Sequence, residues 1–465
     1  MKYLIPSILK IVLDSEIING AIDGMPEFTG LSIDSRTIKS GELFFAIKGE
    51  NNDGHEYIPG AFQRGAAAAV VNRDRISQFS ANPPGLIYVV NDTHEALLNL
   101  AGYIRRQIDA RFAGITGTNG KTTTKEMLYS IVGVNHSAFR SPGNLNNLFG
   151  LPLSLGMMPS DADYAVFELG ISVPGEMTRL ASIIKPDIAV ITNIGPAHLD
   201  TLGTIENVIK AKFELVDNLP VGAVVILNAD DENLTNEAQR RNLKYIGFGI
   251  SNDCDIRATK IRIDDKGNYF CDINGHNIRI PVFGKVNIYN VLAAVAAATV
   301  WECSPDEWTQ GLASFQPVDM RMVSESFEGL HLLIDCYNAN PGSVTASLDT
   351  LCNLPTTGRR IAIIGDMLEL GENEIEFHKN IGAIAAKSGV AFLLCLGSLT
   401  ENTVQEAICE GMTGKHAIHF RDHNELLDQL LKIIHRGDLI LFKGSRGMRI
   451  EKIVSGLKGT AFKRN

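Results

Sequence analysis

With 465 residues, of which 45% are hydrophobic and 21% charged, the chain is long enough for two to four globular domains of about 100–200 residues each. Its formal net charge of −10, without a run of Lys or Arg, argues against a nucleic-acid partner. Seven scattered Cys without a CxxC pair argue against a disulfide framework or zinc site and favour a reducing compartment.

Two further features argue against membrane insertion. The N-terminal apolar run is interrupted by Pro6, Lys10 and Asp14, unlike the usual signal peptide. The longest apolar run elsewhere, Val291–Trp301, is too short to cross a bilayer. We therefore expect a cytoplasmic protein.

Residues 1–109 form the first predicted domain. Short apolar runs at Gly41–Gly49, Ala66–Val71 and Leu86–Val90 lie between turns and indicate strands of a small α/β domain.

Residues 110–316 form the second predicted domain. Its predicted strands are nearly continuous in β-branched and apolar residues, and helical segments lie between them. This alternation predicts a doubly wound parallel sheet with helices on both faces. The predicted strands are RFAGIT from Arg111, Tyr164–Gly170, Ile188–Gly195 and Ala223–Asn228.

Residues 317–465 form the third predicted domain, and the stretch Ser314–Arg321, which overlaps its start, is the predicted linker. The same alternation of strands and helices indicates a second doubly wound, Rossmann-like α/β unit. Its predicted strands are Leu332–Asp335, Arg360–Asp366, Ala391–Gly397 and Asp438–Ser445.

The strongest local motif is GITGTNGKTTTKEM, in which a Gly-rich turn joins a predicted strand to a predicted helix. Backbone N–H groups of such a turn point at an anion, and Gly117 and Gly120 allow close approach of phosphate. Lys121 can reach the β- and γ-phosphates, and the Thr122 hydroxyl can bind Mg²⁺. The alternative is a Gly-rich turn that merely precedes a helix.

The loop departs from the usual nine-residue phosphate-binding pattern, because Ile115 stands where the first Gly is expected. The variant GTNGKTT resembles the loop of Mur ligases and the related folylpolyglutamate synthases. The resemblance continues, in order and with matching spacing, from about residue 31 to 454. The residues expected at the nucleotide phosphates are Gly117, Thr118, Asn119, Gly120, Lys121, Thr122 and Thr123.

Glu168 and His198 are the predicted metal ligands, together with Thr122. Glu168 ends one predicted strand and His198 follows the next, where α/β folds build their sites. A carboxylate and an imidazole beside bound phosphates can hold Mg²⁺ with few protein ligands. Each alone could be a strand-end acid or a turn-capping histidine. In Mur ligases, residues at these places bind magnesium.

Lys212 lies in a segment of helical pattern, about fourteen residues after His198. From the residues alone, it could be a solvated lysine that pairs with Glu206 or Glu214. The resemblance implies instead a lysine that CO₂ converts to a carbamate and that helps to position Mg²⁺. This reaction requires a neutral amine, and hence a lowered pKa. Lys210 is the competing candidate.

Four residues are candidates for contacts with the rest of ATP. Asn287 and Asn290 begin an apolar helix and could simply cap it. Their segment resembles the Mur ligase motif HNxxN, whose Asn residues contact adenine, although Val286 replaces the His. Arg321 resembles the linker arginine that reaches phosphate, and Asp335 resembles the acid that binds ribose.

The N-terminal domain and one central loop resemble the part of these ligases that binds the UDP-linked substrate. Ser35 and Arg36 lie in the run LSIDSRTIKSGELFFAIKGENNDGH, where Arg could bind diphosphate or form a surface turn. Asn144, Asn146 and Asn147 lie in SPGNLNNLFGLP, where Asn could also serve only as a turn former.

Three C-terminal segments, Asp335–Ser343, Ile364–Glu372 and Leu441–Val454, resemble the Mur ligases that add D-alanyl-D-alanine. The last domain of the family binds the incoming amine. From the residues alone, Asp366 and Glu369 could simply be charges at the start of a helix. The candidates near the dipeptide are Asn338, Asn340, Asp366, Lys443 and Ser445.

The resemblance implies a three-domain ATP-dependent ligase that joins D-alanyl-D-alanine to UDP-N-acetylmuramoyl-tripeptide through an acyl phosphate, in peptidoglycan precursor synthesis. ATP and Mg²⁺, with a CO₂-derived lysine carbamate, are the implied cofactors, and a monomer is expected. A sister ligase that adds one amino acid, or a nucleotide-dependent switch protein, remains the alternative. The sequence leaves open whether the third residue of the tripeptide is lysine or a diamino-dicarboxylic acid.

Overall fold

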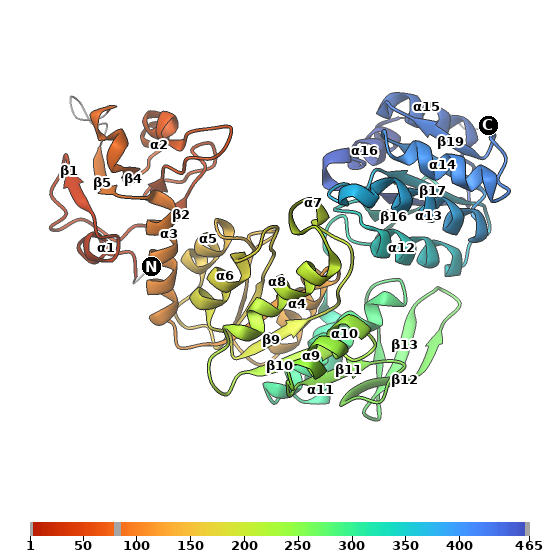
Figure 1. Cartoon of the computed structure of the whole chain (residues 1–465), viewed down its shortest axis with the longest axis horizontal. Helices are drawn as coiled ribbons and strands as arrows, with labels where there is room; N and C mark the ends of the chain where they lie inside the picture. Colours follow the sequence, from red (N-terminus) through yellow and green to blue (C-terminus); the bar gives the residue numbers. More distant parts are fainter. Residues whose placement is uncertain (1–2, 79–84, 461–465) are drawn as a thin grey trace.

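The computed structural model describes residues 3–78 and 85–460. Three α/β lobes follow one another along the chain, and the central lobe lies between the other two (Figure 1). Each lobe is built on its own sheet, of five, nine and six strands. The expected three-part α/β fold is therefore confirmed, while the exact boundaries 1–109, 110–316 and 317–465 stay a prediction.

The N-terminal sheet has the strand order β1-β5-β4-β3-β2, and only β1 runs antiparallel to its neighbour. The strands β3 and β5 lie within the apolar runs that predicted them, and β4 extends one residue beyond its run, to Asn72. The elements are α1 (Pro6–Val12), β1 (Glu16–Ile18), β2 (Leu31–Ser32), β3 (Leu43–Phe45), α2 (Ile58–Gln63), β4 (Ala68–Asn72), β5 (Leu86–Val90) and α3 (Thr93–Arg106), with short 3₁₀ turns at Gly54–Tyr57 and Arg73–Gln78.

The central sheet has the order β14-β13-β12-β11-β10-β9-β6-β8-β7, parallel from β7 to β12 and antiparallel beyond it. Its strands are β6 (Arg111–Thr116), β7 (Ala138–Arg140), β8 (Tyr164–Glu168), β9 (Ile188–Ile191), β10 (Val224–Asn228), β11 (Ile246–Gly249), β12 (Ile256–Ile263), β13 (Tyr269–Ile273) and β14 (His276–Arg279). Its helices are α4 (Lys121–Val132), α5 (Gly150–Met157), α6 (Glu176–Ile184), α7 (Leu199–Leu202), α8 (Ile205–Asp217), α9 (Glu232–Arg240), α10 (Val286–Val300) and α11 (Pro305–Ser314).

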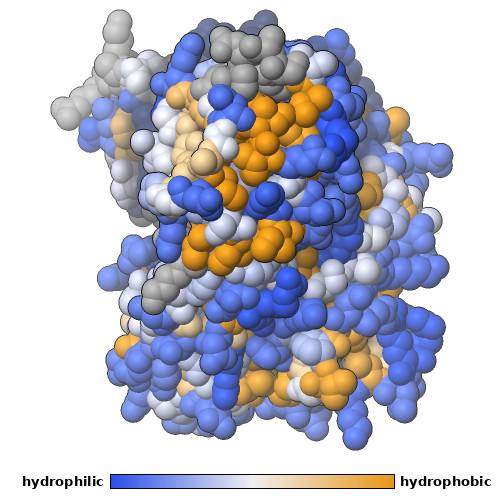
Figure 2. Space-filling model, turned by 90° about the vertical axis from the view of Figure 1, so that its left-hand side faces the viewer, coloured by the Kyte–Doolittle hydropathy of each residue, from blue (hydrophilic) through white to orange (hydrophobic). Residues whose placement is uncertain are grey.

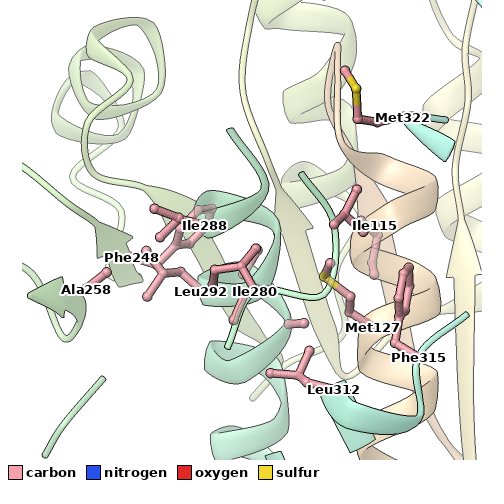
Figure 3. Packing of buried hydrophobic residues seen from close by; sticks show 14 of the residues in the cluster. Ile115, Met127, Phe248, Ala258, Ile280, Ile288, Leu292, Leu312, Phe315 and Met322 are labelled. Atoms are coloured by element: carbon pink, nitrogen blue, oxygen red, sulfur yellow. The ribbon is translucent and has the colours of Figure 1, made fainter. Parts of the chain in front are cut away.

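Alternate residues of the central strands face two separate cores, because side chains of a strand point to opposite faces. On one face, Ile115 packs with Met127 of α4 and with Ile288 and Leu292 of α10 (Figure 3). On the other face, Phe112 and its neighbours pack against α5, α6 and α8. Both faces of this sheet are therefore covered, as its continuous apolar strands predicted.

The C-terminal sheet has the order β15-β16-β20-β17-β18-β19, in which only β15 is antiparallel to its neighbour. The four predicted strands correspond to β16, β17, β18 and β20. The elements are β15 (Val323–Phe327), β16 (Leu330–Asp335), α12 (Pro341–Asn353), β17 (Arg360–Gly365), α13 (Glu374–Lys387), β18 (Phe392–Leu396), α14 (Thr400–Cys409), β19 (Ala417–Phe420), α15 (His423–Ile433), β20 (Leu439–Lys443) and α16 (Glu451–Gly459), with short 3₁₀ turns at Gly371–Asn373 and Arg446–Met448.

The surface at the N-terminal end is mixed in polarity. Apolar residues gather mainly in the upper part of this face, over the N-terminal domain, between hydrophilic ones (Figure 2). Ile11 on α1 is 81% exposed and is the most exposed large apolar side chain of this domain among the described residues. Within residues 3–78 and 85–460, no helix has the length and apolar character that crossing a bilayer requires.

Candidate active site

A cleft of about 650 Å³ opens at the carboxyl ends of β6, β8 and β9 and continues to the C-terminal domain. Its lining includes the whole phosphate loop, the segment 192–198, the start of α10 and residues around Asp335. In parallel α/β sheets, sites form at the carboxyl ends of strands because the loops that follow them converge there. The cleft therefore brings segments of two domains to one place.

Two glycines of the phosphate loop are required by its geometry. Gly117 and Gly120 have φ values of 143° and 83°, in the region that favours glycine. A Cβ atom on Gly117 would collide with Thr192 Oγ1, and one on Gly120 would collide with Asn290 Oδ1. Glycine at these positions lets the loop pack against its neighbours and turn its N–H groups toward an anion.

The loop is fixed from the side by the residues after β9. The Asn119 N–H donates to Asn193 Oδ1 at 2.8 Å, and the Thr118 N–H donates to the Asn193 carbonyl at 2.9 Å. The Thr192 hydroxyl donates to the Asn119 carbonyl at 2.6 Å. These bonds within the protein hold the loop in shape, so the anion site is preorganised.

Lys121 begins α4, and its ammonium folds back over the loop. It donates to the carbonyls of Gly117 and Thr118 at 2.9 and 3.1 Å. Burial lowers the pKa of Lys121, the charge of Glu168 acts in the opposite direction, and that of Arg321 lowers it further. A cation in this position is ready to exchange loop carbonyls for phosphate oxygens.

Glu168, at the end of β8, is only 3% exposed and is surrounded by hydrogen-bond donors. Its carboxylate accepts from the Thr122 hydroxyl at 2.6 Å and from Asn146 Nδ2 at 2.8 Å. Burial acts to raise the pKa of Glu168, but the charges of Lys121, Arg321 and Lys125 outweigh it and lower the pKa. Glu168 is therefore a buried anion at neutral pH, beside the phosphate loop.

His198 precedes α7 and contacts the C-terminal domain. Its Nδ1 lies 2.6 Å from Glu369 Oε2, and this hydrogen bond lowers the pKa of Glu369. Its Nε2 has no hydrogen-bond partner within the described part of the chain. In metal sites, a histidine commonly bonds a carboxylate through one ring nitrogen and binds the metal through the other.

Lys212 lies on α8, is 4% exposed and lines the cleft, whereas Lys210 is exposed and does not. Burial, assisted by the charge of Lys121, lowers the pKa of Lys212 well below its usual value. No carboxylate forms an ion pair with Lys212 among the residues described. The lowered pKa favours the neutral amine that the predicted carbamylation requires.

Asn287 and Asn290 are buried at the start of α10 and form a small amide network. Asn290 Nδ2 donates to Asn287 Oδ1 at 2.8 Å, and Asn287 Nδ2 donates to the Phe283 carbonyl at 2.6 Å. The Thr124 hydroxyl, on the phosphate-loop helix, donates to Asn290 Oδ1 at 3.4 Å. Asn290 thus connects α10 to α4, and both Asn side chains line the cleft.

Asp335 and Lys443 lie on adjacent strands of the C-terminal sheet and form a buried ion pair of 2.8 Å. The Ser347 hydroxyl also donates to Asp335 Oδ2, at 2.6 Å. Arg321, before β15, places its guanidinium 4.1 Å from the centre of the Tyr337 ring, and its buried Nε has no partner among the described residues. A cation with an unused donor therefore faces this part of the cleft.

Comparison with protein-family models covers most of the chain. The Mur ligase middle domain matches residues 115–298, the Mur ligase glutamate ligase domain matches residues 320–446, and the Mur ligase family catalytic domain matches residues 27–102. The UDP-N-acetylmuramoyl-tripeptide–D-alanyl-D-alanine ligase of Bacillus subtilis is 35% identical over 433 residues, which cover 92% of this chain and 93% of that protein. The chain belongs to the Mur ligase family.

Other relatives of this Mur ligase agree in name and in fold. The UDP-N-acetylmuramoyl-tripeptide–D-alanyl-D-alanine ligase of Escherichia coli is 32% identical over 96% of this chain and 97% of its own. A crystal structure of MurF from Acinetobacter baumannii has a TM-score of 0.87, 28% identity and 98% coverage of both chains. The MurF ligase of Thermotoga maritima, solved in complex with ADP, has a TM-score of 0.80 and 27% identity, with coverage of 93% of this chain and 98% of that one.

Most of the residues predicted from the sequence of this Mur ligase line the one cleft. Their individual roles stay predictions, but their convergence is a structural fact. The residues are Gly117, Thr118, Asn119, Gly120, Lys121, Thr122, Thr123, Asn146, Asn147, Glu168, His198, Lys212, Asn287, Asn290, Arg321, Asp335, Asn338, Asn340 and Lys443.

Five predicted residues lie outside the lining of this cleft. Ser35 and Arg36 are on the N-terminal domain, where Arg36 is 84% exposed and pairs with Asp34. Asn144 lines an adjoining cavity instead. Asp366 accepts three backbone N–H bonds at the start of α14, and Ser445 accepts one from Leu368. The side chains of Asp366 and Ser445 are buried and thus hold loops of the C-terminal domain together.

Some residues of the site carry no sequence signal that reveals them. Asn193 anchors the phosphate loop, and Tyr337 carries Arg321 on its ring. Each lies in a segment in which other residues are the predicted site residues. Their own roles depend on contacts between distant parts of the chain. The sequence indicates Glu369 only as a charge at a helix start, whereas in the structure it lies before the 3₁₀ turn Gly371–Asn373 and pairs with His198.

The donors near the loop suit magnesium bound together with a nucleotide. Within the described residues, no group of three or more His, Cys, Asp or Glu side chains gathers as a metal site. Glu168 and the Thr122 hydroxyl offer oxygen ligands beside the phosphate loop. Mg²⁺ usually keeps several waters and takes one or two carboxylates together with substrate phosphates. So sparse a set of protein ligands therefore fits Mg²⁺ that arrives with ATP.

Proposed function

We propose that this Mur ligase joins D-alanyl-D-alanine to UDP-N-acetylmuramoyl-tripeptide, with cleavage of ATP to ADP and phosphate. The observation that carries the proposal is the convergence of Lys121, Glu168, His198 and Lys212 on one cleft at a phosphate-binding loop. Relatives that cover more than nine tenths of the chain bear the name of this reaction.

The proposed chemistry must overcome the low reactivity of a carboxylate and its repulsion from the phosphates of ATP. A free carboxylate does not acylate an amine at neutral pH, so one of its oxygens first attacks the γ-phosphorus of ATP. This forms an acyl phosphate and releases ADP. The amine of the dipeptide then attacks the carbonyl carbon, and the C–O bond breaks with phosphate as the leaving group. Lys121 offsets the repulsion between carboxylate and phosphate in the first step.

Mg²⁺ would be held by Glu168, Thr122, His198 and the carbamate of Lys212, and it supplies charge neutralisation at the phosphates. The contact of His198 Nδ1 with Glu369 supports this role, because it fixes the ring and leaves Nε2 free for a ligand. The lowered pKa of Lys212 supports carbamylation, because only the neutral amine reacts with CO₂.

The remaining substrate groups are assigned by domain. We place the uridine diphosphate on the N-terminal domain near Ser35 and Arg36, since the only partner of the exposed Arg36 guanidinium among the described residues is Asp34. Adenine lies by Asn287, Asn290 and Val286, and ribose lies by Asp335. The dipeptide approaches from the C-terminal domain, along Asn338, Asn340 and Lys443, with Asp366 and Ser445 as supports behind it.

A substrate-panel assay of phosphate release tests the proposal. Purified protein with ATP, Mg²⁺ and UDP-N-acetylmuramoyl-tripeptide should release phosphate when D-alanyl-D-alanine is added, and much less when single amino acids are added. Equal turnover with one amino acid would identify a sister ligase. Nucleotide binding without substrate-dependent turnover would indicate a switch protein and refute the proposal.

A further inference from the structure

A second cavity, also of about 650 Å³, adjoins the nucleotide cleft. It is formed by α4, β7 and the connecting segment 316–321, and Asn144 lies in its wall. Thr122, Arg321 and Tyr337 line both cavities. Its volume lies in the range of about 300–1,000 Å³ that is usual for small-molecule sites. A group bound in this cavity would therefore lie next to the place where the carboxylate meets ATP.

The wall of this cavity contains two arginines, Arg140 and Arg321, and two carboxylates, Glu126 and Asp319. Arg140 Nε lies 2.7 Å from one oxygen of Glu126, and Lys125 Nζ lies 3.1 Å from the other. Glu126 is thus shared by two cations, one of which, Lys125, is fully buried. Around Glu126, two cations against one carboxylate leave a local excess of positive charge, which favours an anionic group beside Arg140.

Arg140 is also preorganised for a carboxylate. Its guanidinium lies 4.1 Å from the centre of the Tyr129 ring, which fixes its plane. Its two terminal nitrogens make no hydrogen bond to any described residue, and its side chain is 41% exposed. A planar guanidinium with unused donors matches the two oxygens of a carboxylate.

The position of the cavity identifies which part of a substrate would fill it. This step rests on the proposed function. The reacting carboxyl belongs to the third residue of the tripeptide, and the side chain of that residue is attached to the neighbouring carbon atom, Cα. That side chain must therefore occupy space beside the phosphate loop, and the second cavity provides it.

We propose that the second cavity binds the side chain of the third residue, and that Arg140 favours a diamino-dicarboxylic acid over lysine by binding its terminal carboxylate. Both side chains also end in an ammonium group. Asp319, an exposed acid of the segment 316–321, lines the same cavity and provides a partner for that group. Arg140 thus binds the carboxylate that only the diamino-dicarboxylic acid has, and Asp319 binds the ammonium group that both residues have.

The test compares two UDP-N-acetylmuramoyl-tripeptides, one with meso-diaminopimelate and one with lysine as third residue. For the unaltered protein, we expect kcat/KM to be at least about tenfold higher with the diaminopimelate peptide, as one charged hydrogen-bonded contact provides. Arg140→Gln should raise KM for that peptide by about tenfold and leave KM for the lysine peptide and for ATP unchanged. Equal kcat/KM for both peptides in the unaltered protein would overturn the inference.

Matched variants separate this result from unfolding and from a wrong function. Arg140→Lys keeps the positive charge but loses the two parallel donors of the guanidinium. Its KM for the diaminopimelate peptide should therefore lie between those of the unaltered protein and of Arg140→Gln. Arg240→Gln removes an exposed arginine that pairs with Glu237 on α9, and it should leave both peptides unaffected. Equal losses for both peptides with Arg140→Gln would contradict the selective role. Absence of turnover with either peptide and D-alanyl-D-alanine would instead refute the proposed function itself.

Discussion

Four lysines in or near the cleft differ in what balances their charge. Lys443 pairs with Asp335 at 2.8 Å, and Lys125 pairs with Glu126 at 3.1 Å. The charge of Glu168 acts to raise the pKa of Lys121, whereas only burial and the charge of Lys121 act on the pKa of Lys212, and both lower it. A buried lysine without a carboxylate is costly when charged. At the scale of the residue, this asymmetry makes Lys212 the one lysine of the four suited to carbamylation.

Replacing Lys212 by Met should reduce turnover while stabilising the fold. The folded pKa lies well below the unfolded one, so between these values the unfolded chain binds more protons and the lysine destabilises the protein, increasingly as pH falls. Melting curves from pH 6 to 9 should show a higher Tm for Lys212→Met, with the largest gain at low pH. Added short carboxylic acids should partly restore the turnover of Lys212→Ala. Full activity of either variant without such acids would contradict the carbamate.

Lys121→Met should abolish measurable turnover, with a loss of at least about 10²–10³-fold in kcat, because the preorganised cation beside the γ-phosphate is removed. Phosphate release at saturating substrates measures this. Thermal unfolding should be little changed, because the carbonyls of Gly117 and Thr118 that lose Lys121 line the cleft, where water can replace its hydrogen bonds. Retained turnover in a folded variant would be inconsistent with the assigned role.

Site residues can be predicted from the sequence when they belong to a local sequence motif. The phosphate loop and His198 follow strands, and Glu168 ends one, and this is enough to place them at one sheet edge. Asp366 and Ser445 share the same kind of segment but are buried by hydrogen bonds within the C-terminal domain. Whether a polar residue faces a cleft or holds a loop depends on tertiary contacts, which a single segment does not encode.

At the scale of the element, helix α4 connects the phosphate loop to the asparagine loop 141–147. Fully buried Lys125, one turn after Lys121, donates to the Ser141 carbonyl at 2.7 Å. The Ser141 hydroxyl accepts from the Glu168 N–H at 3.1 Å, and Asn146 of the same loop donates to the Glu168 carboxylate. The helix that positions the phosphates thus also positions the loop that lies beside them.

Lys125→Met should therefore loosen this loop. It keeps the apolar stem but leaves the Ser141 carbonyl without its donor, at a cost of about 1–3 kcal/mol in the free energy of unfolding. The KM for the muramoyl tripeptide should rise more than the KM for ATP, which steady-state kinetics would show. Lys260→Met, which removes an exposed lysine, is the control and should change the free energy of unfolding by less than about 1 kcal/mol. An equal rise of both KM values would contradict a specific effect on the loop.

Four parallel strands of the central sheet were predicted from the sequence, whereas the parallel strands β7 and β11 and the hairpin strands were not. The strands β6, β8, β9 and β10 are buried on both faces and appear as continuous apolar runs. The strand β12 joins the sheet parallel to β11, and β13 and β14 extend it antiparallel. Outer residues of β12 are exposed and charged, as at Lys260 and Arg262. Such strands lack a continuous apolar pattern, so composition alone does not reveal them.

At the scale of the whole molecule, the central and C-terminal domains meet at the site itself. Asn119 and Asn340 exchange amide hydrogen bonds of 2.8 and 3.2 Å across the two domains. The Gly371 N–H donates to Asp200 Oδ1 at 2.7 Å, next to the pair of His198 and Glu369. These pairs join residues more than 170 positions apart, so no local pattern could have predicted them. The arrangement of domains therefore determines whether the site is complete.

A double-mutant cycle tests whether Glu369 acts through His198. Glu369→Ala and His198→Ala should each lower kcat/KM, and the double variant should be no worse than His198→Ala alone, because Glu369 orients a ring that is then absent. Glu372→Ala removes an exposed acid from the adjacent 3₁₀ turn and should leave kcat/KM unchanged. Additive losses in the cycle would show that Glu369 has a separate role.

The central claim is that the cleft activates a peptide carboxyl by transferring phosphate to it. Labelling the terminal carboxylate of the UDP-linked tripeptide with ¹⁸O tests this directly, with mass spectrometry of the released phosphate. During turnover with ATP and D-alanyl-D-alanine, each phosphate should carry a single ¹⁸O atom from the carboxylate. Ligated product accompanied by unlabelled phosphate would contradict the account.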